Sequence, residues 1–227
     1  MTDIYTRSSQ AKSSASPSSH PFRAERYQAT TKRLIDLLIC AVLLPGLLPI
    51  IACLYLVARL DGGPAFFGHV RIGQNGRAFR CWKIRTMVVD AQSRLEALLE
   101  SDPAAREEWE RDRKLRNDPR VTPIGDFLRK TSLDELPQIW NVLVGEMSLV
   151  GPRPVTEPEL ERYGSQQRVY KALRPGITGL WQVSGRNDVS YSRRVALDSS
   201  YYADLSLAAD LRILLRTAHA VMGRTGR

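Results

Sequence analysis

Leu37 to Ala58 form the stretch LLICAVLLPGLLPIIACLYLVA, an apolar run of 22 residues without a formal charge. As a helix with a rise of about 1.5 Å per residue, this run would be about 33 Å long, enough to cross a hydrocarbon core of about 30 Å. A helix in the core of a soluble protein is the alternative. Such a helix usually keeps a polar stripe, and this run has none. The stretch therefore predicts a helix embedded in a membrane.

Two prolines and a glycine interrupt the middle of this run, at Pro45, Gly46 and Pro49. Each proline removes a helical hydrogen bond and its ring pushes against the preceding turn, so we expect a kink. Residues 1–33 carry six Lys and Arg against two acidic residues, which favours a cytoplasmic amino-terminal flank. A re-entrant hairpin keeps both flanks on that side, whereas a straight span separates them. We predict the hairpin over residues 31–60, with the single span as the alternative.

The segments on either side of the apolar run differ in composition. Residues 1–30 contain seven serines among the first nineteen positions and lack hydrophobic periodicity, so we expect a flexible tail. No apolar core follows Met1 closely enough for a secretory signal peptide. Over the whole chain 43% of residues are hydrophobic and 25% are charged, an ordinary globular composition. We therefore assign residues 61–227 to a single folded catalytic domain.

The net charge of +9 implies an anionic partner: nucleic acid, a lipid headgroup or a phosphorylated substrate. Aromatic residues make up only 7% of the chain and do not alternate with a basic stripe, which argues against nucleic-acid recognition by stacking. The three cysteines show no C-x-x-C spacing. A disulfide framework and a cysteine-rich zinc site are therefore not expected.

Short-range patterns predict strands first and helices later in this domain. Residues 65–72 and 77–84 are partly alternating runs on either side of Asn75-Gly76, which is a strong hairpin signal. Residues 90–116 are polar, with Glu and Arg interleaved in a helical pattern, and Pro103 divides them. We expect a β-hairpin followed by a solvated helical region in two parts.

The carboxyl-terminal half continues with helices and loops. Residues 127–144 form a more apolar helical region, and 145–190 are rich in loop signals. A final helix over 203–222 places leucines near one face and Arg212 and Arg216 off it, which is typical either of packing or of an interfacial membrane helix. The predicted fold class is α+β and mainly helical, with a re-entrant membrane hairpin before a small cytoplasmic domain that carries a β-hairpin and interfacial amphipathic helices.

The segment SLDELPQ, residues 132–138, is the strongest candidate for chemistry. Its Ser-x-x-Glu spacing also matches a helix capping box, and spacing alone favours that interpretation. Pro137 weakens it, because in such a helix the proline would lie past the first turn, where it costs stability. If the helix instead begins at about Leu136, Asp134 and Glu135 lie in a turn at its positive end. Two carboxylates there could serve as a nucleophile and a magnesium ligand.

Several cations accompany this acidic pair in the sequence. Arg153 lies between Pro152 and Pro154, whose rings stiffen the backbone, and this suits the presentation of a guanidinium to phosphate. For an arginine chosen at random, a solvated surface charge is the commoner role. The chain has no G-x-G-x-x-G, Walker, H-E-x-x-H, G-x-S-x-G or D-x-D motif. The other cations that could surround the pair are Lys83, Arg85, Arg129 and Lys130.

Five motifs in this order resemble those of the bacterial sugar transferases, which are monotopic polyprenyl-phosphate phosphoglycosyl transferases. The resemblance covers about residues 31–222 and is greatest to the short members that begin exopolysaccharide synthesis. Its specificity comes from the ordered set, because each motif alone is short. The motifs are K-R-x-x-D at 32–36, KIRTM at 83–87, SLDELPQ at 132–138, MSLVGPRP at 147–154 and RPGITG at 174–179.

The resemblance implies roles for the matching residues. Asp134 matches the nucleophilic aspartate of the family and Glu135 its acidic partner, both associated with magnesium, so the implied cofactor is Mg²⁺. Pro49 matches the proline that breaks the re-entrant helix, with Pro45 nearby. Leu48 precedes it where some members have serine, so a side-chain hydrogen bond at the kink is missing. The residues implied to bind phosphates or substrate are Lys83, Arg85, Arg129, Arg153 and Pro154.

The implied reaction transfers a hexose 1-phosphate, galactose or glucose, from a UDP-sugar to undecaprenyl phosphate and releases UMP. It would proceed through an aspartyl-phosphosugar on Asp134, as the first membrane step of exopolysaccharide synthesis at the cytoplasmic face of the inner membrane. A membrane-anchored basic module without catalysis is the alternative, and an inactive member of the same family is a second one. The intact Asp134-Glu135 pair argues against inactivity. The choice of sugar and the oligomeric state do not follow from the sequence.

Overall fold

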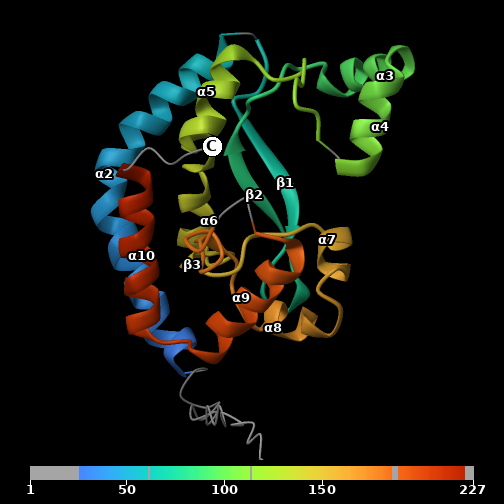
Figure 1. The fold of residues 1–227 in the computed structure, drawn as a ribbon. Helices are drawn as coiled ribbons and strands as arrows, with labels where there is room; N and C mark the ends of the chain where they lie inside the picture. The colour runs from blue at the N-terminus through green and yellow to red at the C-terminus, as the bar shows by residue number, and fades with distance from the viewer. Residues whose placement is uncertain (1–25, 61, 113, 186–188, 223–227) are drawn as a thin grey trace, which may run out of the picture.

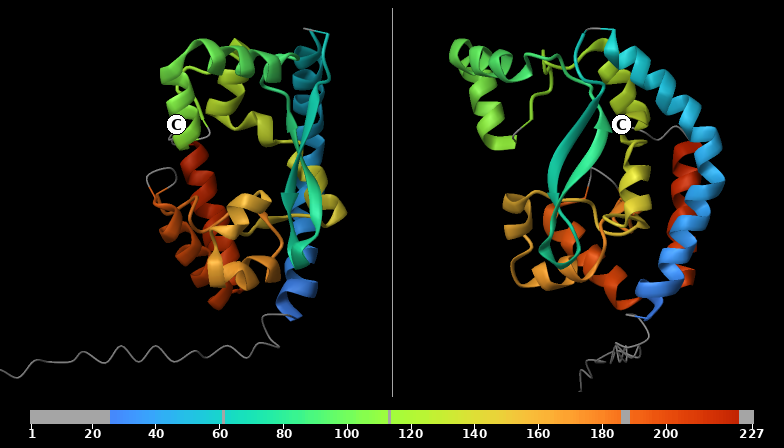
Figure 2. Two further views of the ribbon diagram at one scale, coloured as in Figure 1. Left: turned by 90° about the vertical axis from the view of Figure 1, so that its right-hand side faces the viewer. Right: turned by 180° about the vertical axis from the view of Figure 1, so that it is seen from behind.

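The computed structural model describes residues 26–60, 62–112, 114–185 and 189–222. Figure 1 shows a long helix, α2, along one side of a body of shorter helices and two small sheets, with α10 beside it. Figure 2 shows the same pairing of α2 and α10 from behind. The fold is α+β and mainly helical, as predicted. Most of the predicted tail, residues 1–30, lies outside the described residues.

The apolar run forms a single continuous helix. α2 covers Lys32–Arg59 and contains both Pro45 and Pro49, and the π-helical turn η1, Tyr27–Thr31, leads into it. Figure 1 shows α2 bending between its two ends, as two internal prolines predict. Only 6% of the residues in its most apolar 18-residue stretch are buried. The alternative of a soluble core helix is therefore wrong, and by length and composition α2 is able to cross a membrane.

Both ends of α2 are held by the same body. Near its start, the buried Lys32 pairs with Asp210 of the last helix at 2.6 Å. One turn later, Asp36 Oδ1 accepts a hydrogen bond from the backbone N–H of Leu149 at 3.0 Å. Near its end, the carbonyl of Ala58 accepts a hydrogen bond from Arg85 Nη2 at 2.7 Å. The central part of α2 presents exposed leucines, isoleucine and valine to the outside.

The predicted β-hairpin around Asn75-Gly76 is confirmed. β1, Phe66–Ile72, and β2, Ala78–Ile84, pair antiparallel with His69 opposite Cys81. The connecting turn contains the short η2, Gln74–Gly76. Asn75 has φ 59° and Gly76 has φ 74°, the left-handed conformations that an Asn-Gly hairpin turn requires. The hairpin therefore forms where its turn residues predict it.

The polar helical region is also confirmed. α3, Ala91–Ser101, and α4, Pro103–Asp112, are separated at Pro103, which begins the second helix because proline is tolerated in a first turn. Figure 1 shows the two helices projecting away from α2 and α10, on the far side of the hairpin. They make a peripheral unit beside the site rather than part of its wall.

The region predicted as one apolar helix over 127–144 is interrupted. α5, Pro123–Thr131, ends at Ser132, whose φ of 58° is left-handed. A 3-10 turn, η3, Leu133–Glu135, follows, and α6, Gln138–Val144, begins only after Pro137. The side chain of Ser132 makes no capping hydrogen bond, so the capping-box interpretation is wrong. The late helix start that Pro137 suggested is confirmed, two residues further on.

The loop-rich region contains a second sheet. β3, Ser148–Val150, and β4, Gly176–Thr178, pair in parallel. Gly151 and Gly176 lie against each other, and a Cβ on Gly176 would stand 2.1 Å from the backbone nitrogen of Gly151. Only glycine permits this approach, so the two proline-glycine motifs are packed backbone to backbone. The elements between these strands are α7, Glu157–Glu161, η4, Gly164–Gln166, and α8, Gln167–Ala172.

The end of the chain differs from the prediction of one final helix from residue 203. α9, Tyr191–Ala203, closes there, and α10, Leu207–Met222, begins after a short connection. The predicted leucine face is divided, since Leu205 is buried and Leu214 packs against the core, whereas Leu211 and Leu215 are exposed. The buried leucines support packing, and the exposed ones support the membrane-surface interpretation.

The main hydrophobic core fills the space between α2, the hairpin, α6, the β3–β4 sheet and the last two helices. A second cluster around Tyr163 and Tyr170 packs under α7 and α8. Cys81 of the main core, and Ile177 packed against it, also line a pocket on the same face of β2. The buried residues that define the main core include Cys40, Phe79, Val142, Met147, Leu173, Tyr201 and Ile213.

Candidate active site

The acidic pair lies on the η3 turn, directly facing the hairpin. The left-handed Ser132 turns the chain sharply after α5, and Pro137 delays the next helix, so Asp134 and Glu135 stand in the gap between two helices. Asp134 is only 7% exposed. Lys83 from β2 reaches both carboxylates, with its Nζ 2.6 Å from Glu135 Oε1 and 3.6 Å from Asp134 Oδ2. The sequence therefore places two carboxylates and one ammonium together.

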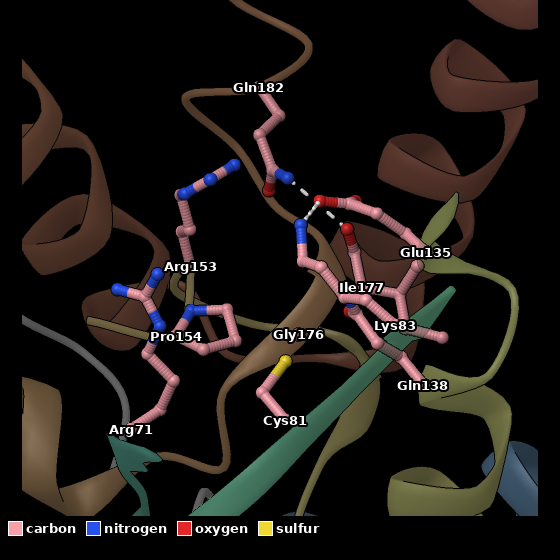
Figure 3. Close-up of a pocket in the computed structure, with 10 residues that line it drawn as sticks. All are labelled: Arg71, Cys81, Lys83, Glu135, Gln138, Arg153, Pro154, Gly176, Ile177 and Gln182. Carbon is pink, nitrogen blue, oxygen red and sulfur yellow. Dashed lines mark hydrogen bonds and ion pairs between the residues drawn. The ribbon is translucent and has the colours of Figure 1, made fainter. Parts of the chain in front are cut away.

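A pocket opens next to this triad, and Figure 3 shows its lining side chains. The Lys83–Glu135 pair lies on one side, and the arginines Arg71 and Arg153 lie on the other. Cations thus face the acidic pair across a small hollow, an arrangement suited to a ligand that carries phosphate. The lining residues are Arg71, Cys81, Lys83, Glu135, Gln138, Arg153, Pro154, Gly176, Ile177 and Gln182.

The two carboxyls differ in their proton affinity. Burial raises the pKa of the Asp134 carboxyl, and the adjacent Glu135 charge adds to this, against the opposing effects of Lys83 and Arg129. Burial acts on Glu135 too, but Lys83 and Arg153 outweigh it, so the pKa of Glu135 is lowered. Glu135 is thus the fixed anion that holds Lys83. Asp134 is the more basic, less satisfied carboxylate, which is the better nucleophile of the two.

The sheet of β3 and β4 brings the second motif to the pocket. The N–H of Gly151 donates to the carbonyl of Thr178 at 2.9 Å, and the N–H of Gly176 donates to the carbonyl of Pro152 at 2.8 Å. These bonds hold the following residues, Arg153 and Pro154, at the rim. The parallel pairing thereby joins two motifs that the sequence separates.

Arg129 stands behind the acidic pair rather than in the pocket lining. Its Nε donates to Thr86 Oγ1 at 2.9 Å, which ties α5 to the segment after β2. Its charge lowers the pKa of Asp134, against burial. The structure therefore brings together Lys83, Asp134 and Glu135, with Arg129 close enough to act on them electrostatically.

Arg85 is not among the residues that line the pocket. Its guanidinium donates to three backbone carbonyls, of Pro64 at 2.6 Å, Met87 at 3.0 Å and Ala58 at 2.7 Å. The side chain joins the hairpin to the end of α2. This geometry is that of a structural arginine, and the predicted role of Arg85 in substrate binding finds no support in it.

Sequence reasoning missed four polar or thiol side chains of the lining: Arg71, Cys81, Gln138 and Gln182. The hairpin register could have found two of them. Side chains two apart on a strand share a face, so Cys81 lies on the face of Lys83, and Arg71 is directly opposite Phe79 on that same face. The other two come from α6 and from the segment after β4, and only the tertiary fold brings them here.

Asp134 and Glu135 are also the candidate metal ligands. Among the described residues, no group of three or more His, Cys, Asp or Glu side chains is arranged to hold a metal ion. A pair of carboxylates fits Mg²⁺, which keeps waters and binds through one or two carboxylates together with substrate phosphates. The pair does not make a closed site for zinc or calcium.

A family model described as bacterial sugar transferase matches residues 27–224, which include every element around this pocket. The chain belongs to the bacterial sugar transferase family. The resemblance carried by the five sequence motifs is therefore confirmed. In this family member, Glu135, Lys83 and the Arg153-Pro154 rim line one pocket, and Asp134 lies beside it, 3.6 Å from Lys83.

Three relatives indicate where the chain lies among bacterial sugar transferases. The UDP-galactose-lipid carrier transferase of Erwinia amylovora is 54% identical over 195 residues, which cover 86% of this chain and 41% of that protein. The undecaprenyl-phosphate galactose phosphotransferase of Salmonella typhimurium is 50% identical over 203 residues, covering 89% and 43%. The exopolysaccharide production protein ExoY of Sinorhizobium fredii is 53% identical over 192 residues, covering 84% and 85%. The chain thus spans about two fifths of the first two proteins and most of the third.

Proposed function

We propose that the protein transfers a hexose 1-phosphate from a UDP-sugar to undecaprenyl phosphate and releases UMP. The hexose is galactose or glucose, and the product begins a lipid-linked exopolysaccharide. The observation that carries this proposal is the Asp134-Glu135 pair on its 3-10 turn, with Lys83 on one side and a cationic pocket in front. The relatives' names supply the substrate class, and the pocket supplies the chemistry.

The first step is an attack by Asp134 Oδ on the phosphorus that carries the sugar. The bond between this phosphorus and the bridging oxygen breaks, and the oxygen leaves with both electrons on UMP. The resulting acyl phosphate joins Asp134 to the sugar phosphate. Splitting the transfer in this way lets one site serve a soluble donor and a lipid acceptor in turn.

In the second step, an oxygen of the lipid phosphate attacks the same phosphorus. The bond to Asp134 breaks, the carboxylate is regenerated, and a diphosphate joins lipid and sugar. In both steps an anionic nucleophile, first the Asp134 carboxylate and then the lipid phosphate, approaches an anionic phosphate. Cations must therefore offset this repulsion. Lys83 and Arg153 line the pocket where that charge develops.

Asp134 and Glu135 would hold Mg²⁺ together with the donor's diphosphate oxygens. When bound, the ion supplies charge neutralisation at the phosphates. Lys83 already pairs with Glu135 at 2.6 Å, so the ammonium keeps this carboxylate ionised and correctly oriented without help from the ion. Asp134 is left with the longer contact of 3.6 Å and hence with an oxygen available for attack.

We also propose the re-entrant course of α2, with the catalytic domain on the cytoplasmic face of the inner membrane. One body contacts α2 at both ends, through Lys32 at its start and through Arg85 and Ala58 at its end. A helix that crossed the bilayer would have ends about 30 Å of hydrocarbon apart, and a domain on one side could not hold both. Exposed apolar side chains on α5, α6 and α10 support a body lying at the membrane surface. They are Ile124, Phe127, Trp140, Val144, Leu211 and Leu215.

The test traps the intermediate. The full-length protein in detergent, with Mg²⁺ and radiolabelled UDP-galactose or UDP-glucose but without lipid, should acquire a phosphosugar adduct and release one UMP per enzyme. Adding undecaprenyl phosphate should discharge the adduct. Asp134→Asn should form no adduct. The matched control is Asp126→Asn, because Asp126 is an exposed carboxylate on α5 that forms an ion pair with Lys130 at the surface. Full turnover in Asp134→Asn would refute the assignment.

A further inference from the structure

Arg71 enters the pocket from β1, a strand to which no motif of the sequence drew attention. Its Nη1 donates to Glu159 Oε2 at 2.9 Å, and its side chain is 17% exposed. Half-buried arginines of this kind are usually oriented by an anionic partner, and here the partner comes from α7, far away in the sequence. Arg71 therefore has a defined direction, toward the pocket that it lines.

Glu159 is itself held in place. Its Oε2 accepts hydrogen bonds from the backbone N–H of Thr156 at 2.8 Å and from Thr156 Oγ1 at 3.0 Å, at the start of α7. Burial alone would raise the pKa of Glu159, but the hydrogen bonds from Thr156 and the charge of Arg71 outweigh it. The pKa of Glu159 is therefore lowered, and this carboxylate is ionised. A fixed anion at the first turn of α7 thus fixes the guanidinium of Arg71.

The second guanidinium of the pocket belongs to Arg153. No hydrogen bond or ion pair ties it to any other part of the chain that the structure describes. Two cations in one small pocket repel each other, and the ion pair with Glu159 fixes only Arg71 in direct contact. An anion placed between them would receive charge-assisted hydrogen bonds from two planar forks, which match phosphate oxygens well.

The two sides of the pocket therefore carry different charged groups. Figure 3 shows the Lys83–Glu135 pair on one side and Arg71 and Arg153 on the opposite side. Lys83 Nζ also lies 3.6 Å from Asp134 Oδ2, so the first side is the one near the nucleophile. A nucleoside diphosphate sugar carries two phosphates joined by one oxygen. If the sugar-bearing phosphorus lies at Asp134, the other phosphate points away from it, toward the arginines.

We propose that Arg71, together with Arg153, binds the phosphate that leaves with the nucleoside, and that Glu159 is the positioning residue for Arg71. This inference rests on the proposed function. When the bridging oxygen takes the bonding electrons, the leaving monophosphate gains negative charge, and the two guanidiniums stabilise it. Arg71 thereby acts on the first half-reaction and on UMP. In the second half-reaction the lipid phosphate attacks from the side that UMP has left, so it meets the same two guanidiniums.

The experiment measures UMP binding to the full-length protein by calorimetry, and then both half-reactions. Arg71→Gln should weaken UMP binding about tenfold to a hundredfold and slow adduct formation from UDP-sugar by a similar factor. Discharge of the adduct by undecaprenyl phosphate should slow as well, because the incoming phosphate takes the place that UMP leaves. Arg71→Lys should recover only part of the loss, because an ammonium cannot make the paired hydrogen bonds of a fork.

Glu159→Gln tests the positioning role. It should weaken UMP binding by a few-fold, less than Arg71→Gln, and the double variant should be no weaker than Arg71→Gln alone, because Glu159 acts through Arg71. The matched control is Arg80→Gln, an exposed arginine of the same hairpin that is absent from the lining. Arg80→Gln should bind UMP as the unchanged protein does.

Two failures are distinguishable. If the unchanged protein forms the adduct and releases UMP but Arg71→Gln binds UMP as tightly as Arg80→Gln, the assignment of Arg71 is overturned and the proposed function stands. If the unchanged protein releases no UMP from any UDP-sugar, the proposed function itself fails. A loss of lipid-phosphate discharge in Arg71→Gln, with UMP binding intact, also overturns the assignment, since it would place Arg71 at the acceptor alone.

Discussion

Two lysine–carboxylate pairs of the same length lie in different regions of this protein. Lys32 meets Asp210 at 2.6 Å between α2 and α10, and Lys83 meets Glu135 at 2.6 Å between the hairpin and the η3 turn. The first pair is closed, with side chains 4% and 6% exposed. The second is open to the pocket, with side chains 25% and 26% exposed.

The two regions also differ in how completely their carboxylates are satisfied. Asp210 receives Lys32, the hydroxyl of Tyr27 at 2.8 Å and the hydroxyl of Tyr201 at 2.6 Å. Asp134, beside the second pair, has Lys83 at 3.6 Å. A buried carboxylate with every partner in place stabilises the fold. One that is buried but incompletely paired is available to react. The contrast indicates that Asp210 stabilises the fold, whereas Asp134 is placed to react.

Substitution of Asp134 should give the largest effect on activity. Asp134→Asn keeps the shape of the side chain but removes the nucleophile, so turnover of UDP-sugar should fall at least about a thousandfold, a barrier increase of about 4 kcal/mol. UMP release measured with purified protein checks this. Asp210→Asn, the equivalent change at the closed pair, should lower activity only in proportion to the loss of folded protein. Equal specific activity losses in the two folded variants would contradict the comparison.

The closed pair should dominate stability. Lys32→Met leaves Asp210 buried without its cation, which costs about 3–5 kcal/mol and lowers Tm by on the order of 10 °C. Differential scanning fluorimetry of the detergent-solubilised protein measures this shift. The control is Lys130→Met, which breaks an ion pair of identical length, 2.6 Å, between side chains 68% and 55% exposed. An exposed pair contributes about 0–1 kcal/mol, so equal shifts in the two variants would refute the contrast.

The open site should set the acid limit of activity. Burial and Glu135 raise the pKa of Asp134 above the 3.8 of an ordinary aspartate, and only the ionised form attacks. The rate of adduct formation should therefore fall about tenfold per pH unit below an apparent pKa that is higher than 3.8. Stopped-flow measurement of UMP release between pH 4 and 8 checks this. A flat profile down to pH 4 would be inconsistent with Asp134 in this role.

The smallest effect concerns stability at the open site. Because folding raises the pKa of Asp134, the folded state binds more protons than the unfolded state between the two pKa values. Asp134 therefore lowers stability as pH rises through this window. Asp134→Asn should raise Tm at pH 7 by a few degrees and leave it almost unchanged at pH 4. A lower Tm at pH 7 would mean that the ionised Asp134 stabilises the fold, as Asp210 does.

Local signals explain what was predictable from the sequence. The hairpin follows from Asn75-Gly76, whose left-handed angles the turn needs, and the division of the polar helices follows from Pro103. The late start of α6 follows from Pro137, which forces the acidic pair into a turn. In each case one residue restricts its own backbone, so no distant part of the fold has to be known.

The contacts that were not predicted join distant segments. Lys32 and Asp210 are 178 residues apart, and the K-R-x-x-D motif at 32–36 does not indicate Asp210 as the partner of Lys32. The pairing of β3 with β4 depends on two glycines that pack backbone to backbone. Arg85 lies two residues from Lys83 in one motif, yet it bonds to backbone carbonyls on the other side of the strand. Alternation along a strand would place these two cations on the same face, but β2 ends at Ile84, before Arg85. Sequence spacing alone therefore does not say which of the two cations faces the substrate.

The contacts of the body with both ends of α2 also fix the position of this helix relative to the pocket. With Lys32 anchored at one end and Ala58 at the other, the helix cannot slide, rotate or tilt independently of the pocket. A lipid that diffuses laterally along this helix would thus meet the carboxylates at a constant height. Undulations of the bilayer would move anchor and pocket together, so the encounter would need no flexible tether.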